Sequence, residues 1–316
     1  MFKYITKRIL LMIPVVIGVA VLVFTILYFS PSDAASVKLA GTGTAEQLEA
    51  LRESMGLNEP YLVQLGTYLY DIFIKFDLGT SLINGTVIAQ DIAERLPNSM
   101  IIALFGIICS VAVGVPLGIK CAVDQNKPGD VIGMVIALIG ISMPGFWFAL
   151  ICVIIFSFKL GWLPAYGVGS VKYWILPLIA NSFHGVAAQA RQTRSSMLDV
   201  INSDYIIMAR AKGVPEKKVI LRHALPNALI PVITVSGTAF GSMIGGGLII
   251  ETIFGIPGMG YYLVQGVNNR DIPVVMGGVV VISIFFSIIM LLTDLAMAAV
   301  DPRIKAQFAS GGKKHG

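Results

Sequence analysis

Long stretches without charge are the feature of this sequence that most restricts its fold. Long runs without Asp, Glu, Lys or Arg recur along the chain of 316 residues, and six of them lie at residues 9–32, 96–119, 131–158, 173–190, 223–250 and 272–293. An apolar helix of about 20 residues crosses the hydrocarbon core of a bilayer. The sequence therefore predicts an all-α integral membrane protein with six transmembrane helices. We expect these helices at residues 9–30, 98–120, 131–158, 173–195, 227–250 and 272–298 of one transmembrane domain that covers residues 1–316.

The composition supports this fold class, and the expected fourth helix is the least apolar of the six. The chain is 56% hydrophobic and 13% charged, whereas soluble domains carry about 25% charged residues. The fourth helix is interrupted by Asn181, Ser182, His184 and Gln189. Polar side chains inside a membrane usually face other helices or a water-filled cavity. We therefore expect this helix to face protein or a cavity rather than lipid.

The distribution of basic residues predicts the orientation of the chain in the membrane. With the N-terminus inside, the internal segments carry 16 of the 23 Lys and Arg residues, and the external segments carry 7. Basic residues accumulate on the cytoplasmic side, so both termini are expected there. The same asymmetry explains the net charge of +5. Because these residues are not interleaved with stacking aromatics, we expect membrane lipid and no nucleic acid as a partner.

The longest external segment, residues 31–97, is expected to contain helices outside the membrane. Thr44 is a good N-cap and Gly56 a good stop for a helix between them. Apolar residues at helical spacing over residues 61–76 predict an amphipathic helix that lies along the outer membrane surface.

A basic segment at residues 199–224, on the cytoplasmic side, has the sequence signals of two short helices. Gly213 suits the end of the first helix because glycine accepts a left-handed conformation. Pro215 suits the first turn of the second helix. Pro226 and Pro231 predict a turn back into the membrane and a kink in the next span. A positive loop at the lipid surface would explain the charge, whereas a docking site for another protein would also explain the helix signals.

This segment resembles the cytoplasmic signature of permeases from ATP-binding cassette (ABC) importers. In that signature, Glu-Ala-Ala is followed by a Gly and, twelve and thirteen residues after the Gly, by Leu-Pro. The matching residues here are Ala209, Gly213, Leu225 and Pro226, whereas Ile207 and Met208 replace the leading Glu and Ala, and His223 replaces an Ile. The whole stretch "DYIIMARAKG…LRHALPNALIPVI" resembles the dipeptide, oligopeptide and nickel branch more closely. Further resemblances to this branch are "SPSD", "MGLNEPYLVQ", "FDLGTSL", "ETIFGIPGMG" and the closing "DPR".

The resemblance implies a type I importer permease fold in a prokaryotic cell membrane. It implies a second related permease, two cytoplasmic ATPases and an extracytoplasmic substrate-binding protein as partners. The chain has no G-x-x-x-x-G-K-[ST] loop, so we expect no enzyme activity and no bound cofactor, with ATP and Mg²⁺ on the ATPase subunits. The expected ATPase-coupling residues are Tyr205, Ala209, Arg210, Lys212, Gly213, Glu216, Leu225 and Pro226. The implied substrates are di- or oligopeptides, with nickel or a metal chelate as the alternative.

Polar residues inside the expected fourth and fifth helices are candidates for the substrate pathway, because such groups tend to face cavities. They are Asn181, His184, Ser236 and Thr238. An intramembrane enzyme is disfavoured because Ser142 and His184 lack a third orienting group. A secondary transporter would place an ionisable residue near the middle of the membrane, whereas the acidic residues lie near span ends. We expect no catalytic residue and no metal site in this chain.

Overall fold

The computed structural model describes residues 2–30, 34–39 and 43–300, and it is helical nearly throughout this part of the chain. The long elements are α1 (Phe2–Tyr28), α5 (Ile88–Val123), α6 (Pro128–Ser142), α8 (Lys172–Ile201), α11 (Leu225–Phe254) and α13 (Ile272–Val300). The shorter ones are α2 (Ala34–Lys38), α3 (Ala45–Ser54), α4 (Tyr61–Phe73), α7 (Gly145–Cys152), α9 (Asp204–Ala211), α10 (Glu216–Lys218) and α12 (Met259–Asn268). Two π-helical stretches, η1 (Val153–Lys159) and η2 (Val219–Ala224), complete the described part.

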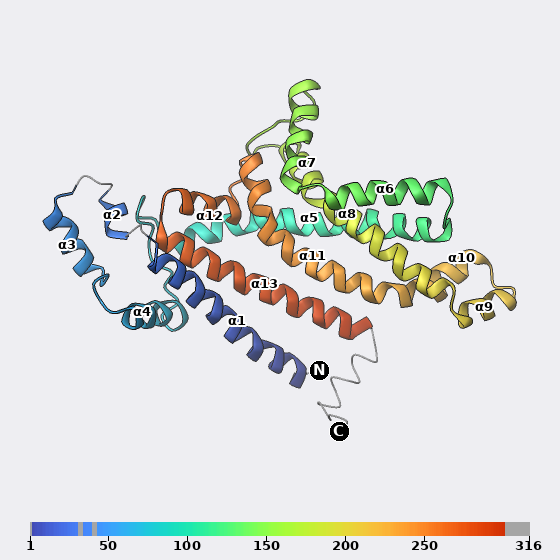
Figure 1. Cartoon of the computed structure of the whole chain (residues 1–316), viewed down its shortest axis with the longest axis horizontal. Coiled ribbons are helices and arrows are strands. Elements are labelled where there is room, and N and C mark those ends of the chain that lie inside the picture. Colours follow the sequence, from blue (N-terminus) through green and yellow to red (C-terminus); the bar gives the residue numbers. More distant parts are fainter. Residues whose placement is uncertain (1, 31–33, 40–42, 301–316) are drawn as a thin grey trace.

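The long helices run side by side, with α2–α4 at one end of the molecule and α9–α10 at the other (Figure 1). Four of them are long and apolar enough to cross a membrane, and two bent pairs could bring the number to six. The bent pairs join α6 to α7 and η1, and the outer end of α11 to α12. The described residues thus form an all-α membrane bundle, as the charge-free stretches predict.

The expected span over residues 131–158 is wrong as a single straight helix. The chain breaks between Ser142 and Gly145, and the two halves are bent by 105°. Met143 is extended, with φ −81° and ψ 126°, because the residue before a proline is pushed out of the helical region. Pro144 has no N–H to continue the helix of α6 and instead precedes the first residue of α7.

Helix α8 covers the expected fourth span. Judged by its composition, it is less apolar than the helices that could cross a membrane. It packs along α5, α6 and α11 and buries Ser182, Gln189, Thr193 and Ser196. Its polar residues therefore face neighbouring helices, as expected from their positions inside a membrane-like sequence.

Small residues of α5 bring its backbone into contact with α8. Gly114 lies where an added Cβ would come within 2.7 Å of the Val186 carbonyl oxygen, and a Cβ on Gly118 would come within 2.5 Å of the Ala190 carbonyl oxygen. Such residues let membrane helices approach closely. The pair α5–α8 is therefore fixed over several turns by backbone packing.

Replacing Gly118 by Ala should destabilise this helix pair, because the backbone of α8 cannot move away as a flexible side chain would. Overpacking of this kind costs about 1–3 kcal/mol. The matched control is Gly129→Ala, where an added Cβ has nothing within 4 Å. Thermal unfolding of the purified protein in detergent checks this, and equal midpoints for the two variants would contradict it.

Helix α1 packs against α13, and an ion pair joins their cytoplasmic ends. Arg8 Nη1 lies 2.9 Å from Asp294 Oδ2. The start of α1 and the end of α13 therefore lie on the same side of the bundle (Figure 1), in agreement with the expected orientation. The expected marker "DPR" at residues 301–303 and the basic tail lie outside the described residues.

The external segment forms α2–α4. Thr44 and Gln47 make the capping box of α3, and Gly56 takes the left-handed conformation with φ +66°, so the expected helix between Thr44 and Gly56 is confirmed. Helix α4 packs on α1 through Tyr68 and Ile72. That α4 lies along the outer membrane surface stays a prediction.

Candidate functional site

The cytoplasmic end of the molecule carries α9, α10 and η2, residues 204–224, which we call the elbow. Gly213 lies between α9 and α10 with φ +76°, and an added Cβ would have nothing within 4 Å. The Gly213 N–H donates to the Arg210 carbonyl at 2.9 Å, and the Val214 N–H donates to the Ala209 carbonyl at 3.3 Å. The predicted glycine stop of the first short helix is therefore confirmed.

The prediction of a separate second helix that turns at Pro226 is wrong. The chain is helical without interruption from Glu216 through η2 into α11. Pro226 lies in the first turn of α11, and Pro231 lies inside that helix. The π-helical turn η2 changes the hydrogen-bond pattern directly before Pro226, so the missing N–H of this proline does not end the helix. The second arm of the elbow is thus an extension of a helix that enters the bundle.

Polar contacts fix the angle of the elbow. Arg210 Nη2 lies 2.7 Å from Glu216 Oε1, across the turn at Gly213. Hydrogen bonding to Glu216 raises the pKa of Arg210, so this guanidinium stays charged. Asn227 Nδ2 donates to Tyr205 Oη at 2.8 Å and ties α9 to the start of α11. Three of the expected coupling residues, Tyr205, Arg210 and Glu216, therefore hold the shape of the elbow.

The inner face of the elbow is buried against the bundle. Ile206, Val219 and Ile220 form one apolar cluster with Met197 of α8. Ala209 and Leu225 pack against the same cluster, so these two expected coupling residues face inward more than outward. A displacement of the elbow therefore acts directly on α8, and through the continuous helix on α11.

The outer face of the elbow combines exposed apolar and basic side chains. Ile207 is 55% exposed and Met208 is 59% exposed. The remaining exposed residues of this face and its edge include Tyr205, Lys212, Gly213, Lys217, Lys218, Leu221, Arg222 and Pro226. Large apolar side chains that remain uncovered and are rimmed by polar residues mark a surface for another protein or for the membrane.

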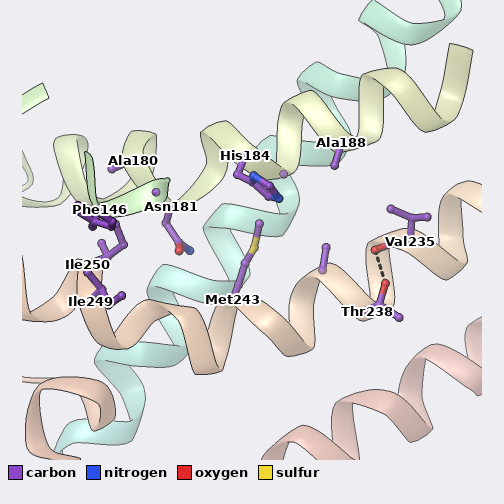
Figure 2. A pocket seen from close by; sticks show the side chains of 13 residues that line it. Phe146, Ala180, Asn181, His184, Ala188, Val235, Thr238, Met243, Ile249 and Ile250 are labelled. Carbon is purple, nitrogen blue, oxygen red and sulfur yellow. Dashed lines mark hydrogen bonds between the residues drawn. The ribbon is translucent and has the colours of Figure 1, made fainter. Parts of the chain in front are cut away.

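A cavity of about 510 Å³ opens between α8 and α11, midway along the bundle. Figure 2 shows Asn181 and His184 projecting from α8 toward α11, which contributes Thr238 and Met243. Three of the four expected pathway residues are therefore brought together. The fourth, Ser236, is not part of the lining and instead accepts a hydrogen bond from Gln189.

The lining of this cavity is neutral. It contains no Asp, Glu, Lys or Arg. The Asn181 amide is oriented by α5, because its Nδ2 donates to the Ile102 carbonyl at 3.2 Å. Within the described residues, no group of three His, Cys, Asp or Glu side chains could hold a metal ion. The cavity can offer apolar contact and single hydrogen bonds to a passing solute.

A buried carboxylate, Glu251, fixes the outer junction of α11 and α12. Glu251 is 1% exposed and accepts hydrogen bonds from Ser99 Oγ at 2.6 Å, Gly260 N at 2.7 Å and Tyr261 N at 3.1 Å. A carboxylate is favoured at the positive end of a helix. Glu251 therefore stabilises the 81° bend between these helices.

Comparison with known proteins assigns this architecture to a family. Two family models cover nearly the whole chain: the inner membrane component of binding-protein-dependent transport systems matches residues 114–306, and the N-terminal part of such components matches residues 1–103. The dipeptide transport system permease protein DppB of Alkalihalophilus pseudofirmus is 40% identical over 96% of this chain and 100% of that protein. The glutathione permease GsiC of Salmonella choleraesuis is 38% identical over 96% of this chain and 99% of its own length.

The fold is also found in solved transporters. The MetNI methionine ABC transporter in its inward-facing conformation aligns with a TM-score of 0.55 at 14% identity, over 67% of this chain and 97% of its own. An amino acid ABC transporter aligns with a TM-score of 0.52 at 14% identity, and the alignment covers 68% of this chain and 94% of that transporter chain. The type I importer permease fold is therefore confirmed, and the chain is a transport component rather than an enzyme. The chain belongs to the inner membrane components of binding-protein-dependent transport systems, which are the multi-pass permeases of ABC importers and work with ATPases and a substrate-binding protein.

Proposed function

We propose that this chain is one of two related permeases that form the translocation pathway of an ATP-driven peptide importer. The observation that carries the proposal is the elbow, whose inner face packs on α8 and whose second arm continues into α11. These are the two helices that carry the polar residues of the cavity. Force applied to the elbow therefore reaches both walls of the pathway.

The ATP-hydrolysing partners supply that force. Two cytoplasmic ATPases bind ATP and Mg²⁺, and one of them grips the exposed apolar and basic face around Ile207 and Met208. Closure of the ATPase pair pushes α9 toward the membrane and changes the angle between α8 and α11. The chain itself binds no cofactor in this scheme. An extracytoplasmic binding protein delivers the substrate to the outer end of the pathway.

Peptides are the best supported substrate class. The relatives named above are permeases for dipeptides and for glutathione, and further relatives that are 40% identical are putative peptide permeases. The cavity lining has no Asp, Glu, Lys or Arg, so no fixed charge there repels or retains a peptide side chain of either sign. A nickel or chelate substrate is the alternative, but among the described residues His184 has no further His, Cys, Asp or Glu side chains grouped with it that could hold a metal ion.

Uptake into proteoliposomes that contain the complete transporter tests this proposal. We expect accumulation of a labelled dipeptide with the binding protein outside and ATP at the ATPases, and no accumulation when ATP is replaced by a non-hydrolysable analogue. Dissipating the proton and sodium gradients should change nothing. Uptake that follows an ion gradient without ATP would contradict the proposal and indicate a secondary transporter.

A further inference from the structure

A partly buried hydrogen bond joins α8 to α11 next to the cavity. Gln189 Nε2 donates to Ser236 Oγ at 2.7 Å, and Ser236 Oγ donates to the Val232 carbonyl at 2.8 Å. Gln189 is completely buried. In sequence, Gln189 follows the cavity residue His184 by five positions, and Ser236 precedes the cavity residue Thr238 by two. The bond therefore lies about one helical turn from the polar walls of the cavity.

The two helices joined by this bond are held by different neighbours. On the α8 side, a Cβ on Gly114 of α5 would lie 2.7 Å from Gln189 Cβ. On the α11 side, a Cβ on Gly237 would overlap Thr293 of α13. Gly114 thus holds the backbone of α5 against α8, and Gly237 holds α11 against the Thr293 side chain of α13. Helices α8 and α11 also pack directly on each other, so their separation depends on the contacts between them, and the bond from Gln189 to Ser236 is one of these.

Burying the amide of Gln189 costs folding free energy, which an apolar side chain packed in the same place would not cost. Its Oε1 atom is buried without a hydrogen-bond partner, and so is Oγ1 of Thr193 one turn further along α8. An unpaired buried polar atom is unfavourable, and an apolar side chain of similar size would avoid that cost. The contribution that only the amide can make is the bond to Ser236.

We propose that Gln189 and Ser236 are positioning residues that set the separation of the two cavity walls and thereby the size of the peptide that passes. Neither residue lines the cavity, so they act through α8 and α11 on Asn181, His184 and Thr238. This inference rests on the proposed function in peptide import and adds its size selectivity. Without the bond, the two helix pairs part more easily and the cavity accepts longer peptides.

The test compares uptake of dialanine and pentaalanine by the complete reconstituted transporter. Gln189→Met and Ser236→Ala should each raise the ratio of pentaalanine to dialanine uptake by roughly fivefold, which is the size of effect expected from the loss of one ordinary hydrogen bond. The double variant should match the single variants, because all three lack the same bond. Ser287→Ala is the control: Ser287 is buried, but its Oγ donates within α13, to the Ser283 carbonyl at 2.8 Å.

A role in folding alone would lower the uptake of both peptides equally, and that result, or additive effects in the double variant, would overturn the inference. A wild-type transporter that moves neither peptide would overturn the proposed function instead. In that case the inference is tested by measuring the distance between spin labels attached at the exposed positions Arg191 and Thr234. Gln189→Met should lengthen and broaden the distance between them, and an unchanged distance would refute the positioning role.

Discussion

Replacing Gly213 by Val should weaken the coupling between ATP hydrolysis and uptake by roughly tenfold. Gly213 has φ +76°, a conformation that costs most residues about 1–2 kcal/mol and β-branched residues more. That strain shifts the equilibrium constant between the bent elbow and other conformations of the turn by roughly tenfold or more against the bent form. We expect peptide uptake by the complete transporter to fall by about this factor, while the ATPases continue to hydrolyse ATP. The measurement is the number of peptides transported for each ATP hydrolysed.

Gly56→Val is the matched control for this variant. Gly56 is also left-handed, with φ +66°, and an added Cβ there also meets nothing within 4 Å. It ends α3 in the external segment, far from the elbow. The same strain at this position should leave the ratio of transport to hydrolysis unchanged. Equal ratios for both variants and the wild type would show that the bend at Gly213 does not transmit force.

Replacing Arg194 by Ala should cause the largest loss of stability. Arg194 Nε and Nη2 bind the two oxygens of Asp130 at 2.5 and 2.7 Å, and the Asp130 side chain is 2% exposed. Removing one partner leaves a buried charge unpaired, which costs about 3–5 kcal/mol. Arg194→Lys should recover only part of the lost stability, because a lysine ammonium cannot donate to both Asp130 oxygens in the planar geometry of a guanidinium. Thermal unfolding of the purified transporter measures the effect.

A neighbouring exposed pair supplies the control. Lys127 Nζ lies 2.8 Å from Asp124 Oδ1, but the Lys127 side chain is 67% exposed. Exposed pairs contribute about 1 kcal/mol or less, so Lys127→Ala should barely change the unfolding midpoint. If Arg194→Ala unfolded at the same temperature as Lys127→Ala, the buried pair between α6 and α8 would not stabilise the bundle.

Features that depend on local chemistry could be predicted from the sequence. Only glycine adopts the conformation of Gly213 at little cost, so the end of α9 was predictable. The cap at Thr44 was predictable for a similar reason, since its hydroxyl satisfies the nearby Gln47 N–H. The lengths of the stretches without charged residues predicted the elements that cross the membrane. The Pro144-Gly145 break was missed because prolines occur inside several spans, although a charge-free stretch over 131–158 is longer than one crossing needs.

Features that depend on distant contacts could not be predicted in this way. The partners of Glu251 include Ser99, which lies 152 residues earlier in the chain. The neutral cavity was predictable only in part, because Phe146 and Met243 look like ordinary apolar span residues. The placement of Ser236 follows from helical geometry. Residues two apart on a helix point about 200° apart, so Ser236 and Thr238 cannot both face one cavity.

Photo-cross-linking at the elbow tests the central claim most directly. A benzophenone side chain at Met208, which is 59% exposed on the outer face of α9, should cross-link to the cytoplasmic ATPase in the assembled transporter, and its yield should change when ATP is added. The same group at Leu62, which is 76% exposed on the external side, should give no ATPase product. A Met208 probe that captured only lipid, or nothing, in an actively transporting complex would contradict the account.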